Sequence, residues 1–351
     1  MNKAKYVTAV SAGLAIVGVA FGFAAGQTAE DWNQVIAAAK KEGKVVVYGT
    51  STVRDVSMKV APEFKKRYGI AIEYLNLRSR EVRERVNTEL RTGRQNVDIA
   101  QAGASSLPAI IEDGNIENWL PPSIKVVRPE ILDAFDIPKL PLVPVTVNLR
   151  GILVNTRLVP PGEEPRSFSD LANPKWRGKI LMDDPRSAGA GNSLFVGILV
   201  HPKLGEEFHR KLAQNKPVFL GSASHQQIVQ RVAQGEYPMG LPVDVSVVVE
   251  LKQSPVRWIA PKEGVAYSIP GAALVKNAPR PNAAKVFLEY MLSETFQQII
   301  GQEATPIRKG IKPAIREFDL DLASLLPRPV AETREQREAY YRLAESIYGI
   351  R

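Results

Sequence analysis

The sequence predicts an α/β fold in two lobes joined by a hinge, and three observations lead to this prediction. Short apolar strands alternate with amphipathic helices in both halves of the chain, which indicates parallel sheets covered by helices on both faces. A long stretch of alternating apolar residues, 143–155, separates the two halves. A second extended stretch, 266–275, leads back from the second half, so two extended crossings connect the lobes.

The elements predicted for the first lobe are bounded by glycine, proline or polar residues. Gly43 ends the first helix, and Gly49 follows the first buried strand. Thr52 and Asp55 match an acidic form of the capping box at the start of the second helix. The expected elements are helices at 31–42, 53–68, around 82–90 and at 107–113, with strands at 44–48, 70–76 and 97–101.

A proline-rich loop at 160–165 precedes the second set of strand–helix units. The elements expected there and beyond are strands at 179–182, 218–220, 238–242, 258–260 and 266–274, and helices at 191–199, 204–214, 226–234, 283–292 and 331–348. The chain is thereby divided into a signal peptide (1–25), a first lobe (26–145 with 270–351) and a second lobe (146–269).

Residues 1–25 have the order of features that is typical of a secretory signal. Lys3 and Lys5 precede an uncharged, mostly apolar run, and small residues offer cleavage after Ala24 or after Gly26. Because the run is short and rich in Gly and Ala, we expect cleavage rather than an uncleaved membrane anchor. The signal therefore predicts export to the periplasm, and because no later apolar run reaches spanning length, we expect the mature protein to be soluble.

Composition excludes several kinds of chemistry. The 351 residues include no cysteine, which rules out thiol catalysis, cysteine metal sites, haem attachment and a lipid-modified N-terminal cysteine. The formal charge is +9, of which Lys3 and Lys5 leave with the signal. The remaining positive charge favours anionic solutes or an anionic membrane surface, or it only maintains solubility, since it is spread along the chain.

Motifs of enzymes and of nucleic-acid-binding proteins are missing from the sequence. There is no G-x-S-x-G or S-x-x-K motif, and the histidines form no H-E-x-x-H zinc site. Gly189 and Gly191 lack the third glycine of a dinucleotide fingerprint. The arginines within 78–94 fall on a solvated helix face without interleaved aromatic residues. We therefore expect no enzymatic activity, no cofactor and no nucleic-acid partner.

Three stretches resemble the periplasmic solute-binding proteins of ABC importers, and within them the ferric-ion-binding-like branch. They are WNQV at 32–35 with KVVVYGT at 44–50, SFSDLANPKWRGKI at 167–180, and GAALVKNAPRPNAAK at 271–285. The resemblance implies a two-lobed periplasmic binding protein fold (type II-like). It also implies a hinge-closing receptor that delivers a captured solute to a permease in the inner membrane. We expect the receptor to be a monomer.

Iron-binding members of that branch usually hold the metal with adjacent tyrosines just after the strand that here occupies 237–242. This chain continues there with residues 243–247, which contain Asp244 and no phenol. Ferric iron favours anionic oxygen ligands, for which a single Asp is a poor substitute. Tyr340 and Tyr341 are adjacent but fall in the predicted last helix, where we expect them to pack.

Four junctions between a loop and a helix are candidate ligand sites, because a helix N-terminus offers free N–H groups and the positive end of a dipole. Small and hydroxyl-bearing residues let backbone amides approach a carboxylate, phosphonate or phosphate ester; the alternative for each Ser or Thr is a helix cap. The candidate ligand-binding residues are Thr50, Ser51, Ser105, Ser106, Arg186, Ser187, Ala188, Gly189, Ser222, His225 and Asp244.

Three of these residues have a charged or titratable side chain and a competing interpretation. Arg186 can grip an oxyanion at two points, or it forms an ion pair with Asp183 or Asp184. Asp244 can meet the amine of a zwitterionic solute, or it caps a turn. His225 can donate to an anion, or it caps a helix.

These observations predict the substrate-binding component of an ABC importer. It would capture a small anionic or zwitterionic solute in a cleft between the lobes, with no metal required. Two alternatives stay open: a ferric-iron-binding periplasmic protein, and a bilobal sensor partner without transport.

Overall fold

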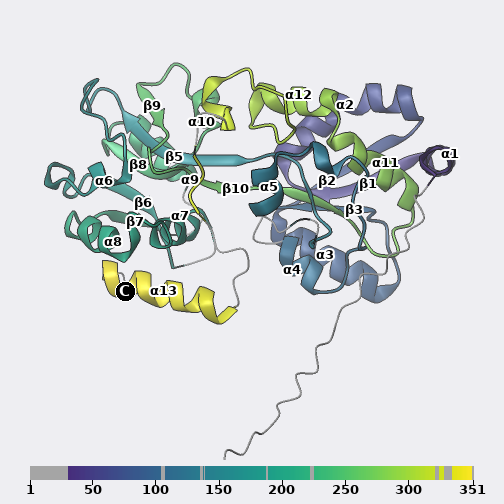
Figure 1. The fold of residues 1–351 in the computed structure, drawn as a ribbon, viewed down its shortest axis with the longest axis horizontal. Helices are drawn as coiled ribbons and strands as arrows, with labels where there is room; N and C mark the ends of the chain where they lie inside the picture. The colour runs from purple at the N-terminus through teal and green to yellow at the C-terminus, as the bar shows by residue number, and fades with distance from the viewer. Residues whose placement is uncertain are drawn as a thin grey trace, which may run out of the picture.

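The computed structural model describes residues 31–103, 107–134, 137, 139–186, 189–221, 225–320, 324–327 and 334–349. It contains two β-sheets, each covered by helices, and the two halves lie side by side (Figure 1). This architecture confirms the predicted fold class. The expected signal peptide, residues 1–25, lies outside the described residues.

The first sheet has five strands, and its first three run parallel. β1 pairs in parallel with β2 and β3, whereas β11 pairs antiparallel with β3 and β4. The order across the sheet is β2 (Ala71–Asn76), β1 (Lys44–Gly49), β3 (Ile99–Ala102), β11 (Gly271–Leu274) and β4 (Val143–Pro144).

Helices cover both faces of this first sheet, which explains the continuous apolar run of β1. Val45 and Val47 belong to the core on one face, and Val46 and Tyr48 to the core on the other. A strand buried on both faces is apolar throughout and does not alternate. The surrounding helices are α1 (Trp32–Glu42), α2 (Ser51–Tyr68), α3 (Ser79–Thr92), α4 (Leu107–Glu112), α5 (Pro129–Ala134), α11 (Pro281–Met291) and α12 (Glu294–Glu303).

The second sheet has six strands and combines parallel and antiparallel pairs. β6 pairs in parallel with β7 and β8, whereas β5 pairs antiparallel with β8, β9 and β10. The strands are β10 (Ala266–Ser268), β5 (Asn148–Asn155), β8 (Met239–Asp244), β6 (Ile180–Asp183) and β7 (Val218–Leu220), in spatial order, with β9 (Val256–Ile259) beside β5. The helices of this half are α6 (Phe168–Leu171), α7 (Ala190–Leu199), α8 (Gly205–Gln214), α9 (His225–Ala233), α10 (Val247–Glu250) and α13 (Arg334–Tyr348).

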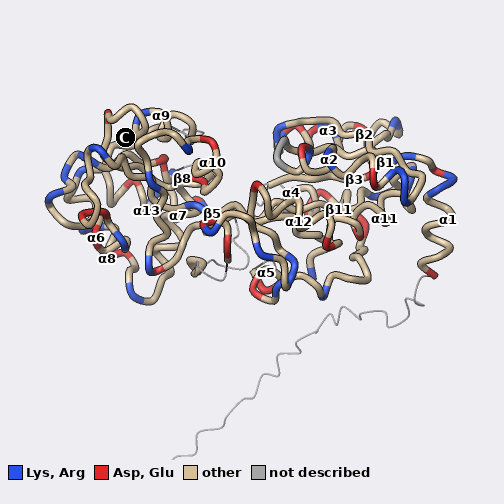
Figure 2. The backbone as a smooth tube through the Cα atoms, turned by 90° about the horizontal axis from the view of Figure 1, so that it is seen from above, with Lys and Arg blue, Asp and Glu red and all other residues tan. Residues whose placement is uncertain are grey.

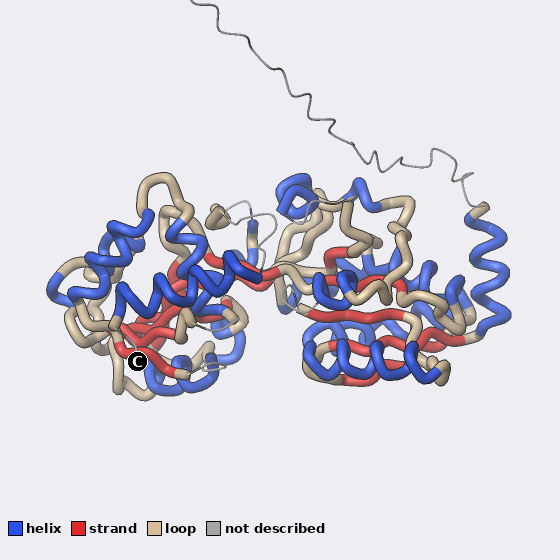
Figure 3. Tube along the Cα trace, turned by 90° about the horizontal axis from the view of Figure 1, so that it is seen from below, coloured by secondary structure: helices blue, strands red, loops and turns tan. Residues whose placement is uncertain are grey.

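Two crossings join the sheets, at the two extended stretches that the sequence predicts. One runs from β4 in the first sheet to β5 in the second, and the other from β10 in the second to β11 in the first. Figure 3 shows the chain passing between the two halves in extended form. The single strand expected at 266–274 is two strands, which end and begin on either side of Ile269 and Pro270.

The last helix packs on the second half, although the expected first lobe included residues 270–351. Tyr348 of α13 donates a hydrogen bond to Nδ1 of His209, at 2.7 Å, and packs against Phe195 and Phe219. Leu325 forms a bridge with Val265, which leads the chain to that side. The remaining boundaries, at 145 and 270, stay a prediction, but α13 belongs with α7 and α8 (Figure 1).

The arginine-rich helix α3 is ion-paired along its exposed side. Arg80 pairs with Glu84 at 2.8 Å, and Arg83 pairs with Asp113 at 2.8 Å. Val82 is buried on the opposite side. Lys and Arg are spread over both halves (Figure 2). Within the described residues, no helix combines the length and apolar character needed to span a membrane.

Candidate functional site

The ends of the parallel strands in the first sheet place Thr50 beside two polar side chains. The backbone N–H and the hydroxyl of Thr50 both donate to Oε1 of Gln101, at 2.7 and 3.0 Å. The Tyr74 hydroxyl donates to the same oxygen at 3.0 Å and to the Thr50 carbonyl at 3.2 Å. A side chain at Gly49 would overlap Gln101 and Tyr74, so this close arrangement requires glycine.

Thr50 is therefore not a side-chain cap of α2. Its hydroxyl donates to Gln101 of the neighbouring strand β3, and it makes no hydrogen bond to the first turn of α2. The predicted capping box of Thr52 and Asp55 is also wrong in position, because the helix begins at Ser51 and Thr50 occupies the cap. The first turn of α2 thus lacks the cap that a threonine there usually supplies.

Gln101 leaves one donor unused at this edge. Its side chain is fully buried, and Nε2 has no hydrogen-bond partner among the described residues. Since Oε1 accepts from the Thr50 amide, the orientation of the side-chain amide is determined and Nε2 must be the unpaired atom. Burial raises the pKa of Tyr74 well above its ordinary value, so its hydroxyl stays a donor at neutral pH.

The corresponding edge of the second sheet brings Asp244 and Arg150 together. They lie opposite each other in the β5–β8 ladder, and Arg150 Nε is 3.9 Å from Asp244 Oδ2. The side chains are only 18 and 21 % exposed. The other Asp244 oxygen accepts from the Ser246 amide at 3.2 Å, which is the turn cap expected as the alternative role of this residue. Asp244 thus caps a turn through one carboxylate oxygen and faces the Arg150 guanidinium with the other.

His225 stands at the start of α9 within the electrostatic reach of this pair. Burial lowers its pKa below the ordinary value, and Arg150 acts in the same direction, while Asp244, Glu250 and Asp183 oppose the change. The imidazole is therefore neutral at pH 7 and offers one donor and one acceptor. His225, Asp244 and Arg150 form a polar cluster that combines both signs of charge, and we call it the β8-end cluster.

The junction between β6 and α7 is closed by its own residues. Asp183 Oδ2 accepts the Gly191 amide at 2.9 Å, and Asn192 Nδ2 donates to the Pro185 carbonyl at 2.9 Å. A Cβ at position 191 would lie 2.6 Å from the Asp183 carbonyl oxygen, so only glycine fits there. The Asp183 carboxylate therefore takes an amide that would otherwise be available to an anion.

Arg186 takes the ion-pair role that the sequence left open. Its Nη2 is 2.8 Å from Asp184 Oδ2, and its Nε is 3.1 Å from Oδ1. Burial opposes ionisation of Asp184, but the hydrogen bonds from Arg186 hold the pKa of Asp184 below its ordinary value. A solute that binds Arg186 would have to compete with this pair.

The structure does not describe every candidate residue. Gly189 directly precedes α7. Ser51 is the first residue of α2, and only its backbone is described. The candidates outside the described residues are Ser105, Ser106, Ser187, Ala188 and Ser222.

Three polar residues of the two sheet edges were missed by the sequence reasoning. Arg150 had a signal, because it is the only charged residue in the apolar stretch 142–155. Gln101 had a weaker one, as a lone amide inside the buried strand β3. Tyr74 had none, since tyrosine is common in strands.

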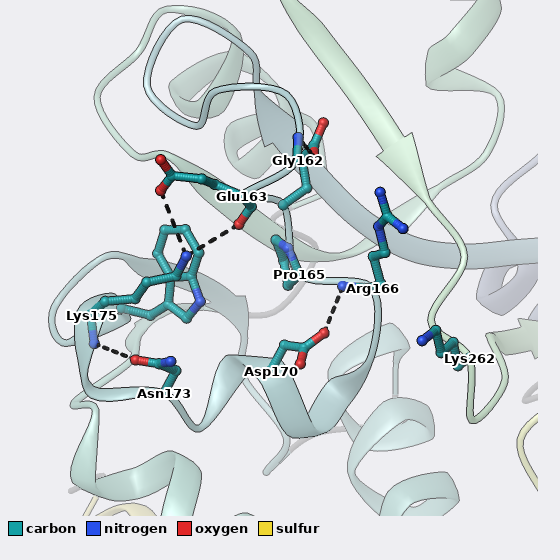
Figure 4. Close-up of a pocket in the computed structure, with 10 residues that line it drawn as sticks. Gly162, Glu163, Pro165, Arg166, Asp170, Asn173, Lys175 and Lys262 are labelled. Atoms are coloured by element: carbon teal, nitrogen blue, oxygen red, sulfur yellow. Dashed lines mark hydrogen bonds and ion pairs between the residues drawn. The ribbon is translucent and has the colours of Figure 1, made fainter.

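Two cavities lie elsewhere on the molecule. One, of about 550 Å³, is lined by residues 162–166, Trp176 and neighbours in the second half. Figure 4 shows Lys175 on one side of it, bonded to Glu163, and Arg166 with Lys262 on the other side. The second, of about 530 Å³, lies in the first half. Neither is lined by a predicted ligand residue. Among the described residues, no group of three or more metal-ligating side chains is placed to hold a metal ion.

Comparison with protein families identifies the class. The family described as bacterial extracellular solute-binding protein matches residues 99–320, so this chain belongs to that family. An uncharacterized protein of Haemophilus influenzae is 25 % identical over 170 residues, which is 47 % of this chain and 49 % of that protein. Iron uptake protein A1 of a Synechocystis strain is 27 % identical over 205 residues, or 51 % and 55 % of the two chains. The chain thus spans about half the length of the curated relatives it matches.

Solved structures show the same fold. Iron-bound HitA from Pseudomonas aeruginosa superposes with a TM-score of 0.66 at 20 % identity, covering 87 % of this chain and 99 % of that one. A Bordetella ferric binding protein gives 0.69 at 20 % identity, with 87 % and 98 % covered. A periplasmic thiamin binding protein gives 0.62 at 17 % identity, with 87 % and 96 % covered. At these identities the likeness establishes the two-lobed fold.

Proposed function

We propose that this protein is the substrate-binding component of an ABC importer, and that it captures a small anionic or zwitterionic solute between its lobes. It would work in the periplasm after export, as a monomer without a cofactor or catalytic activity, and would deliver the solute to an inner-membrane permease. The observation that most supports the proposal is the β8-end cluster. It places a cation, an anion and a neutral imidazole at the end of a parallel strand.

The geometry of Arg150 and Asp244 favours a zwitterionic solute. At 3.9 Å their separation exceeds hydrogen-bond length, so the pair is held by charge alone at this contact. A solute with an amine and an acid group matches both charges of the pair, with the amine at Asp244 and the acid group at Arg150. Charge-assisted hydrogen bonds of this kind are shorter and stronger than neutral ones.

The edge of the first sheet would form the opposite wall of the proposed cleft. There the first turn of α2 offers backbone donors, since no described side chain caps it. Donors on one lobe and a mixed-charge cluster on the other suit a solute that bears a carboxylate. The two crossings would act as the hinge, and closure would be driven by the difference in affinity between the open and closed states.

Titration calorimetry of the mature chain tests the proposal, after a thermal-shift screen of amino acids, carboxylates, phosphate esters, phosphonates and polyamines. A solute at about a thousand times its dissociation constant adds roughly 4 kcal/mol to the free energy of unfolding. For a zwitterionic hit, we expect Asp244→Asn and Arg150→Gln each to weaken binding about 10- to 100-fold, because a charged hydrogen bond is lost. Arg257→Gln, on the neighbouring strand β9, is the control and should bind normally.

Unchanged affinity in both variants would refute the β8-end cluster as the site. The same screen separates the two alternatives. An iron uptake protein is among the relatives and an iron-bound protein is among the structural neighbours, so ferric iron with a synergistic anion is added to the screen. A ferric hit that needs Asp244 would replace the main proposal. Solute binding without uptake into vesicles that carry the permease would favour the sensor partner.

A further inference from the structure

The cavity of about 530 Å³ in the first half lies at the opposite end of α2 from the candidate site. Helix α2 has 18 residues, so the cavity is about 25 Å along the helix axis from Thr50. Its lining includes residues of α1, α2, α11 and α12, which are neighbouring helices of the first half (Figure 1). Its volume is within the range of small-molecule sites. The lining includes Trp32, Arg67, Tyr68, Glu289, Tyr290 and Arg308.

Tyr290 brings an unused hydroxyl to this cavity. The residue is 2 % exposed, and its ring packs against Phe64 and Tyr68, with centroids 5.0 and 6.0 Å apart. The hydroxyl has no hydrogen-bond partner among the described residues. Tyr290 itself lines the cavity, and burial raises the pKa of its hydroxyl to about 12, so it remains a donor at neutral pH. Glu63 and Tyr68 also raise the pKa of this hydroxyl, and Arg67 lowers it; Tyr68 and Arg67 line the cavity.

Two arginines and two glutamates line the cavity, and the two arginines differ in their partners. Arg308 donates to the Leu292 carbonyl at 2.8 Å and to Glu294 at 3.3 Å, so its charge is balanced. Glu289 accepts the Ser123 amide at 3.2 Å. Arg67 is exposed, stacks over the Tyr68 ring at 5.2 Å and forms no ion pair with another described residue. A ligand here would meet a guanidinium, a phenol donor and aromatic surfaces.

We propose that this cavity is a second ligand site, which binds an aromatic carboxylate. The carboxylate is held by Arg67 and the Tyr290 hydroxyl, and the ring packs against Trp32 and Tyr68. Three complementary features support this class of ligand: a buried donor that needs an acceptor, a cation that needs an anion, and aromatic walls that favour a flat ring. The site is separate from the proposed interlobe site.

The test uses 4-fluorobenzoate as the probe, with the full mature chain, followed by ¹⁹F NMR and calorimetry. We expect saturable binding, and at least tenfold weaker binding of two matched compounds: 4-fluorobenzamide, which lacks the charge, and cyclohexanecarboxylate, which lacks the aromatic ring. Tyr290→Phe should weaken 4-fluorobenzoate binding about fivefold, because one hydrogen bond is lost. It should not lower stability, since that hydroxyl has no partner in the protein.

Two further variants locate the site. Arg67→Gln should weaken 4-fluorobenzoate at least tenfold, while Arg91→Gln, an exposed arginine on α3, should leave it unchanged. Asp244→Asn should also leave it unchanged, which separates this site from the proposed solute site. Absence of binding at 10 mM, or full affinity in Tyr290→Phe and Arg67→Gln, would overturn the proposal. Loss of binding in Asp244→Asn alone would place the probe between the lobes and overturn it as well.

Discussion

At the scale of single residues, two glycines show how tightly the chain approaches itself near the candidate site. A Cβ at Gly49 would overlap the side chains of Gln101 and Tyr74, and a Cβ at Gly191 would overlap the carbonyl oxygens of Asp183 and Asp184. Gly49 lets the end of β1 lie close to side chains of β2 and β3, and Gly191 lets the first turn of α7 lie against the end of β6. The sequence displayed Gly189 and Gly191 as a pair, but only the structure distinguishes their roles.

Gly191→Ala should destabilise the fold by about 1–3 kcal/mol, because the added Cβ would lie 2.6 Å from a backbone oxygen that cannot move away easily. Gly189→Ala is the matched control, since the nearest atom to its Cβ would be 3.9 Å away. The free energy of unfolding from urea titrations checks both. Equal stability of the two variants would show that the backbone at Gly191 relaxes freely.

At the same scale, Asp98 is a buried residue that binds three backbone or side-chain donors. Its carboxylate accepts the Val46 amide at 2.7 Å, the Arg280 amide at 3.0 Å and Arg280 Nε at 2.8 Å. It thereby ties β3 to β1 and to the start of α11.

Asp98→Ala should cost about 3–5 kcal/mol, because the Arg280 guanidinium would lose its partner in a largely buried place. The control is Asp113→Ala, just after α4, where the carboxylate pairs with Arg83 of α3 in a solvated place. Hydrogen bonds from Arg83 lower the pKa of Asp113 to about 2, but the pair is solvated and its loss should cost at most about 1 kcal/mol. Chemical denaturation measures both, and a similar loss in the two variants would contradict the argument.

At the scale of elements, helix α13 depends on a buried histidine. Nε2 of His209 lies 3.0 Å from the Phe195 carbonyl, which can only accept, so Nε2 carries the proton and Nδ1 accepts from Tyr348. Burial lowers the pKa of His209 to about 4. A proton on Nδ1 would remove the acceptor that holds the end of α13.

The pH dependence follows from this lowered pKa. Well above pH 6.5, from about pH 7.5, neither the folded nor the unfolded state protonates His209, and its full contribution is present. As the pH falls from 6.5 towards 4, the unfolded state gains the proton first, so stability decreases, by up to about 3 kcal/mol. His209→Gln should flatten this part of the stability–pH curve in urea titrations. An identical pH profile in the variant would disprove the role of His209.

The elements also show where sequence patterns were sufficient. The strand expected at 44–48 is β1, and the helix expected at 204–214 is α8, because each is defined by local apolar periodicity. Helix α12 was not predicted, although Ser293 caps it and Phe296 and Ile300 face the core. Only two residues separate the end of α11 from the start of α12, so the capping serine and short apolar stripe of α12 cannot be told apart from the end of α11 in the sequence.

At the scale of the whole molecule, the two crossings are the only strand connections between the sheets in the described part of the chain. We expect a solute that binds between the lobes to reduce the radius of gyration in small-angle scattering. Arg150→Gln should show no such change at the same solute concentration, because the proposed contact that favours closure is absent. Compaction that persists in this variant would assign closure to other residues.

What the sequence determined by itself was everything encoded locally: the alternation of strands and helices, the two extended crossings and hence the two-lobed fold class. The tertiary structure alone decided which polar groups meet. Arg150 and Asp244 are 94 positions apart along the chain but opposite each other in the β5–β8 ladder, and α13 returns to the second half to pack on His209. Periodicity records which residues are buried, whereas strand pairing and long-range packing determine their neighbours.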